Sequence, residues 1–140
     1  MRTKLATVAG VAGVGLLLTV GPVAAHHAFT AEFDGNNPIV LKGTVTKVEW
    51  INPHSWITIE VKDQAGKVET WRIEAGAPNA LMRRGWRQDS LPPGTEVEVQ
   101  GYRAKDGTNI ANGRYMTLAA DGKVLFVGSA GTGAPDEPRR

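Results

Sequence analysis

The order of strand-like and helix-like segments between residues 39 and 127 constrains the fold of this chain more than any other feature. Apolar and polar residues alternate along several segments rich in β-branched and aromatic side chains, which is the pattern of half-buried β-strands. One short stretch at 79–84, opened by Pro78 and followed by Gly85, suits a helix of about two turns instead. The expected strands are 39–51, 55–62, 67–75, 96–103, 114–119 and 123–127.

This order predicts an all-β fold, a small five-to-six-stranded OB-like barrel with one short helix between strands 3 and 4. The helix is the discriminating feature, because an immunoglobulin-like sandwich needs about seven strands and usually has no helix at that position.

The first expected strand is long and changes phase along its length. Leu41, Gly43 and Val45 share one face, whereas Val48 and Trp50 follow the opposite alternation. A slip in a two-residue alternation predicts a β-bulge or a sharp bend, and Gly43 allows the chain to bend. A long, bent first strand is typical of a small barrel, in which one strand serves both sides of the sheet.

The N-terminal segment has the features of an export signal. Arg2 and Lys4 precede an apolar run at 5–20, and the small residues Val23 and Ala25 stand at the −3 and −1 positions that signal peptidase reads. Cleavage after Ala25 leaves 115 of the 140 residues. We therefore expect a periplasmic or secreted protein with no membrane span after signal cleavage.

Other readings of this segment fit less well. Cleavage after Ala24 would put Pro22 at −3, and cleavage after Ala28 would put His26 there. An uncleaved membrane anchor is weakened by the shortness and the glycines of the apolar run. The expected organisation is a signal peptide at 1–25, an N-terminal arm at 26–38, the barrel at 39–127 and a disordered tail at 128–140.

The charge and the cysteine count exclude several functions. Loss of the signal removes Arg2 and Lys4, so the 16 basic residues fall to 14 against 14 acidic ones, and the mature chain is formally neutral. A neutral, exported domain is not expected to bind nucleic acid. The chain has no cysteine, which excludes disulfides, thiolate metal sites and cysteine nucleophiles.

The expected arm holds a cluster of turn formers at 34–38, after which the first strand is predicted to begin at Ile39. Phe29 and Phe33 precede this turn. We expect these two rings to hold the arm against the barrel.

The chain has three histidines, His26, His27 and His54. If His26 begins the mature chain, its free amine and its imidazole can chelate one metal ion, and His54 or His27 can supply a third nitrogen. This arrangement is called a histidine brace. A site made of nitrogen ligands favours Cu(II) among the first-row divalent metals. The amine must lose its proton, which costs little at neutral pH because its reference pKa is about 7.7–8.0.

A structural role for the same histidines is the alternative. On that hypothesis His26 and His27 are solvated residues after a cleavage site, and His54 is a hydrogen-bonding partner of the Asn52–Pro53 turn. His54 has the parity of Trp56 and not of the core residue Ile57, so we expect it in a cleft, off the main core face.

Two of the four tryptophans, Trp50 and Trp56, flank His54 and could form a ligand platform, with Asn52 as a further contact. Exposed aromatic residues on an OB barrel can stack on a ligand. Trp71 and Trp86 are expected in the core.

No residue pattern points to an enzyme. The chain has no nucleophile elbow, phosphate loop or dinucleotide fingerprint. The carboxylates along the strands alternate with apolar residues and are predicted to lie on solvated faces. These are Glu49, Glu60, Glu69 and Glu74.

Several segments together resemble a family of small exported bacterial proteins that is classed as a domain of unknown function. They are His26–Phe29, Glu32–Asp34, Gly43–Val45, Trp50–His54 and Gly94–Tyr102. The resemblance implies a periplasmic or secreted location and a small β-barrel, and it brings no assigned activity. The strand order is also similar to that of periplasmic bacterial OB-fold proteins, which are mostly binding modules.

The sequence thus predicts an exported, non-enzymatic binding protein that holds copper, or another divalent metal, through His26 with His54 and His27. The predicted ligand is thus a metal ion or another small ligand. The alternative is a metal-free module that binds a peptide, a glycan or a partner protein through Trp50 and Trp56.

Overall fold

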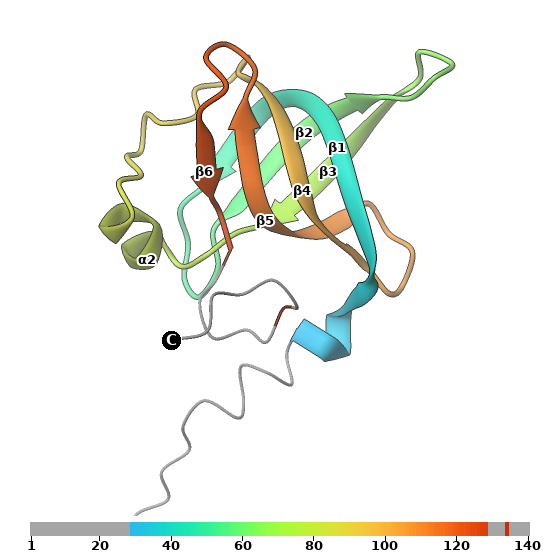
Figure 1. The fold of residues 1–140 in the computed structure, drawn as a ribbon, viewed down its shortest axis with the longest axis horizontal. Coiled ribbons are helices and arrows are strands. Elements are labelled where there is room, and N and C mark those ends of the chain that lie inside the picture. Colours follow the sequence, from blue (N-terminus) through green and yellow to red (C-terminus); the bar gives the residue numbers. More distant parts are fainter. Residues whose placement is uncertain (1–28, 129–133, 135–140) are drawn as a thin grey trace, which may run out of the picture.

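The computed structural model describes residues 29–128 and residue 134. Residues 29–32 form a helical turn ahead of the first strand. Six strands and one short helix follow in the predicted order (Figure 1). They are β1 (Phe33–Glu49), β2 (Trp56–Lys62), β3 (Val68–Glu74), α2 (Pro78–Arg83), β4 (Glu96–Ala104), β5 (Ile110–Leu118) and β6 (Val124–Phe126).

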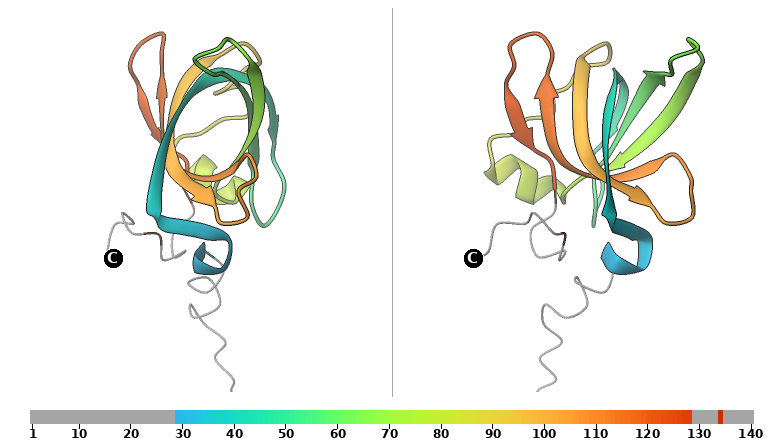
Figure 2. Two further views of the ribbon diagram at one scale, coloured as in Figure 1. Left: turned by 90° about the vertical axis from the view of Figure 1, so that its right-hand side faces the viewer. Right: turned by 45° about the vertical axis from the view of Figure 1, so that its right-hand side comes forward.

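The strands close into a barrel. Their order in the sheet is β3-β2-β1-β4-β5-β6, and β3 also pairs with β5, which completes the ring (Figure 2). The closing pair is parallel and runs from Arg72 opposite Ile110 to Glu74 opposite Asn112, whereas the other pairs are antiparallel. The predicted OB-like barrel with a helix between strands 3 and 4 is confirmed.

Strand β1 carries the predicted bulge. Val45 pairs with Ile59 of β2, but Lys47 pairs with the next residue, Thr58, so Thr46 is the extra residue. The part of β1 before the bulge pairs with both β2 and β4. One long, bent strand therefore joins the two sides of the barrel, as its change of phase predicted.

Two element boundaries differ from the prediction by more than about two residues. Strand β1 begins at Phe33, so the turn formers at 34–38 lie inside it, where its pairing with β4 is irregular between Phe33 and Pro38. Strand β5 begins at Ile110, ahead of the predicted start at residue 114. In both cases pairing with a distant strand extends the element, since Phe33 pairs with Ala104 of β4 and Ile110 pairs with Arg72 of β3.

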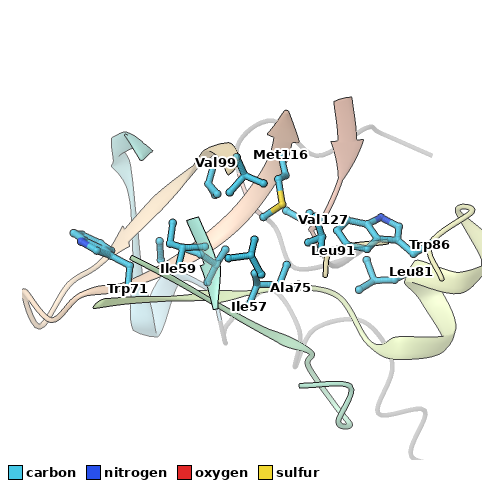
Figure 3. Packing of buried hydrophobic residues seen from close by; sticks show 14 residues of the cluster. Ile57, Ile59, Trp71, Ala75, Leu81, Trp86, Leu91, Val99, Met116 and Val127 are labelled. Carbon is cyan, nitrogen blue, oxygen red and sulfur yellow. The ribbon is translucent and has the colours of Figure 1, made fainter. Parts of the chain in front are cut away.

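The main core fills the barrel and continues under α2. Val45, Ile57 and Ile59 are fully buried inside the barrel, and Leu81 of α2 with Trp86 closes one end (Figure 3). Trp71 is buried as well, so the prediction that Trp71 and Trp86 are core residues is confirmed.

A second, smaller apolar cluster joins the N-terminal segment to the barrel. The Phe29 ring lies 5.8 Å from that of Phe33 and 5.5 Å from that of Tyr102, measured between centroids. All three side chains are buried, together with Ala134. The prediction that Phe29 and Phe33 hold this segment to the body is confirmed.

The expected signal peptide, His26 and His27 lie outside the described residues, as does most of the expected tail. Within residues 29–128, no helix has the length and apolar character needed to cross a membrane.

We predict that Gly43→Ala destabilises the barrel. A Cβ atom at Gly43 would lie 2.5 Å from the carbonyl oxygen of Glu60, in the backbone of the paired strand β2. Relief of this clash must shift one of the two strands, so we expect the free energy of unfolding to fall by about 1–3 kcal/mol in urea titrations. The matched control is Lys42→Ala, at an exposed neighbouring position, which should change it by less than about 0.5 kcal/mol. Equal losses in the two variants would contradict this account.

Candidate functional site

The corner between β1 and β2 is fixed to the end of β3 by backbone hydrogen bonds. The Ser55 N–H donates to the Gly76 carbonyl oxygen at 3.1 Å, and the Ala75 N–H donates to the Ser55 carbonyl oxygen at 2.8 Å. Ser55 is fully buried. The Asn52–Pro53 peptide bond in this corner is cis. His54, next to Ser55, is thereby held beside the last residue of β3.

Three strands contribute one row of side chains at this end of the barrel. Trp56 of β2 lies opposite Glu74 of β3, and Glu74 lies opposite Asn112 of β5. Residues directly opposite one another in a sheet carry their side chains on the same face. Since Ile73 and Ala75 point into the main core, the Glu74 row faces the outside of the barrel.

Glu74 is the centre of a buried hydrogen-bonded group. The Nδ1–H of His54 donates to Oε1 of Glu74 at 2.6 Å, and Nδ2 of Asn112 donates to the same oxygen at 3.2 Å. Glu74 is 5% exposed and Asn112 is 2% exposed, whereas the His54 side chain is 32% exposed. Because the carboxylate holds the proton on Nδ1, the other ring nitrogen, Nε2, is the one that can bind a ligand.

The prediction that Glu74 lies on a solvated strand face is wrong. The alternation that places its side chain outside the barrel is as expected, but the corner and the N-terminal segment cover it. The other strand carboxylates do reach solvent. Glu60 is exposed, and Glu49 and Glu69 are partly exposed in ion pairs with neighbouring lysines.

A cavity of about 390 Å³ lies in front of His54. Its walls come from the N-terminal segment, the β1–β2 corner and the Glu74 row. The lining residues are Phe29, Glu32, Phe33, Ile51, Asn52, Pro53, His54, Trp56, Glu74 and Asn112. The prediction that His54 lies in a cleft is therefore confirmed.

The electrostatics of the cavity favour positive charge on His54. Its hydrogen bond to Glu74 is the largest influence and raises the pKa of His54 above the ordinary value of 6.5. Burial opposes this, and the negative charges of Glu74 and Glu32 raise the pKa further.

The structure separates the two tryptophans that flank His54 in the sequence. Trp56 and Asn52 line the cavity. Trp50 packs against the main core, with its ring edge-on to Trp86 at 6.3 Å between centroids, and it does not line the cavity. The expected joint platform of Trp50 and Trp56 is thus not formed in this arrangement.

The described residues supply one histidine to the site. In residues 29–128, no three side chains among His, Cys, Asp and Glu gather closely enough to form a metal-binding group. His26 and His27 lie outside the described residues, three and two positions before Phe29, which lines the cavity.

Sequence reasoning missed Glu32, Glu74 and Asn112. The β2–β3 hairpin register could have placed Glu74 opposite Trp56. Nothing local could have found Asn112, because it lies outside the predicted strands and reaches Glu74 through the parallel β3–β5 pair.

A larger hollow, of about 630 Å³, lies at the opposite end of the barrel from His54. Both signs of charge line it, including Lys42, Lys62, Glu60 and Glu98. It contains no histidine and no buried polar group of the kind found around Glu74, so we place the candidate site at the His54 cavity.

One protein family matches the chain, over residues 15–113, and its description is "Family of unknown function (DUF6152)". The match spans more than half of the chain, so the chain belongs to this family, and the predicted membership in an uncharacterised domain family is confirmed. The matched range contains every residue that lines the His54 cavity. No curated protein matches the chain.

We predict that Glu74→Gln lowers the pKa of His54 toward 6.5, because it removes the largest cause of the increase. Proton and nitrogen NMR of the imidazole, recorded in a chelator, measure this pKa. The same spectra should show the proton of neutral His54 on Nδ1 in the wild type. Glu60→Gln, which removes an exposed carboxylate at the other end of β2, should leave the pKa unchanged. An unchanged pKa in Glu74→Gln would contradict the hydrogen bond.

The hydrogen bond between His54 and Glu74 should also make the stability of the protein depend on pH. Since the pKa of His54 is higher in the folded protein, its stabilising effect is complete below about pH 6.5 and is lost as pH rises through the folded-state pKa. The wild type should be more stable than Glu74→Gln at acidic pH, and this difference in the free energy of unfolding should shrink as pH rises from about 6.5 through the folded-state pKa. Urea titrations across this range measure it. A difference that grows with pH would have the wrong sign.

Proposed function

We propose that this DUF6152 protein is an exported, non-enzymatic metal-binding protein, and that Nε2 of His54 is one ligand of a Cu(II) ion. The observation that carries the proposal is the 2.6 Å hydrogen bond between Nδ1 of His54 and Glu74. Histidines that bind metals commonly donate their other ring N–H to a carboxylate, which fixes the ring and makes the free nitrogen a stronger ligand.

The N-terminal histidines would supply the remaining nitrogens. His27 and His26 precede the cavity-lining residue Phe29 by two and three positions. An extended chain spans at most about 3.6 Å per residue, so a segment of three residues can span about 11 Å. This length supports a site in which the terminal amine and imidazole of His26 bind the metal together with His54.

Such a site would suit the predicted location. A chain exported after cleavage at Ala25 has His26 as its free terminus. Three nitrogen ligands favour Cu(II) over the other first-row divalent metals, and Glu74 would compensate part of the added positive charge. The proposed role is metal handling in the periplasm or outside the cell.

A Cu(II) titration of the signal-cleaved protein, followed by EPR, tests the proposal. Mass spectrometry first confirms His26 as the N-terminal residue. We expect one Cu(II) per chain with nitrogen hyperfine couplings, a large loss of affinity in His54→Ala, and a loss of about 10- to 100-fold in Glu74→Gln. An added N-terminal glycine should abolish the signal. The control Glu60→Gln should bind like the wild type. No stoichiometric binding, or full affinity in His54→Ala, would exclude the proposed site.

A second candidate function is the binding of a ligand in the same cavity without any metal ion. The specific observation in its favour is that Trp56 and Asn52 line the cavity beside apolar residues such as Ile51 and Pro53. Trp50 would have no direct part in it, since that side chain packs on Trp86.

A further inference from the structure

Apart from His54, the ionisable side chains that line the His54 cavity are carboxylates. Among the described lining residues the ionisable ones are Glu32, Glu74 and His54, and none is a lysine or an arginine. Glu74 is buried and its described hydrogen-bond donors are His54 and Asn112, which leave it without a permanent cationic partner. The two carboxylates therefore outnumber the single positive charge that His54 can carry.

Glu32 strengthens this imbalance at the mouth of the cavity. Its carboxylate forms no ion pair with a described residue. The ammonium group of the nearby Lys105 donates to the Thr30 carbonyl oxygen instead. The charge of Glu32 nevertheless reaches His54, where it contributes to the raised pKa. A ligand that carries positive charge would meet both carboxylates.

The remaining walls are apolar and aromatic. These walls are made by the side chains of Phe29, Phe33, Ile51, Pro53 and Trp56. Aromatic faces attract ammonium and guanidinium groups, and quaternary ammonium ligands are bound in this way. The Trp56 ring already attracts a cation, since the guanidinium carbon of Arg72 lies 4.4 Å from its centroid.

We propose that this cavity binds a small organic ammonium ion, with its charged end between Glu32 and Glu74 and its hydrocarbon part against the apolar walls. The inference rests on the second candidate function, ligand binding in the cavity, and is independent of copper. A volume of about 390 Å³ is within the range of small-molecule sites. A hydrated inorganic ion would gain nothing from the apolar walls, whereas an alkylammonium ion gains from both features.

The test uses the signal-cleaved protein in a metal chelator and three ligands of the same size and different charge, n-butylammonium, n-butanol and butyrate. NMR chemical shifts of the Trp56 indole and the His54 imidazole report occupancy of the cavity. We expect butylammonium to bind about tenfold more tightly than butanol and butyrate not to bind, because one charge-assisted hydrogen bond corresponds to about this factor.

Glu32→Gln should reduce butylammonium affinity about tenfold and leave that of butanol unchanged. Glu32 is exposed, so the variant should fold, and Glu60→Gln at the far end of β2 is the matched control. Equal binding of butanol and butylammonium would overturn the ammonium inference while preserving a ligand cavity. Absence of binding by all three would overturn the inference and the second candidate function together. The copper titration, made without chelator, decides the metal proposal separately.

Discussion

The parallel pairing of β3 with β5 is the interaction on which the rest of the structure depends. These strands are far apart in sequence, and their hydrogen bonds close an otherwise open sheet into a barrel. Closure pairs the edge strand β3 and encloses the main core. It also sets Asn112 beside Glu74, so one backbone pairing completes the barrel and assembles the candidate site.

The site follows from the cost of burying a carboxylate. Glu74 is outside the barrel but is covered, and a buried charge is tolerated when hydrogen bonds compensate its lost hydration. His54 and Asn112 provide them. The arrangement fixes His54 in one orientation and turns Nε2 away from the carboxylate. Stability and ligand binding are therefore coupled here, since the groups that satisfy Glu74 are the groups that shape the cavity.

Both proposed ligands are cations, for the same electrostatic reason. Two carboxylates face the cavity, and no described lysine or arginine lines it. A metal ion would use the nitrogen that Glu74 orients, whereas an organic ammonium ion would use the carboxylates and the aromatic wall. The packing of Phe29 and Phe33 matters for both proposed ligands, because it holds the N-terminal segment at the mouth of the cavity.

The sequence by itself determined the strand order, the helix before β4, the bulge in β1, the core roles of Trp71 and Trp86 and the position of His54 in a cleft. These depend on local alternation and turn chemistry, which side chains impose on neighbouring backbone. The tertiary structure alone decided that Glu74 is buried, that Asn112 belongs to a strand, and that Trp50 packs on the main core while Trp56 lines the cavity. Each of these depends on contacts with segments distant in the chain, and no local pattern records which distant surface will cover a given face.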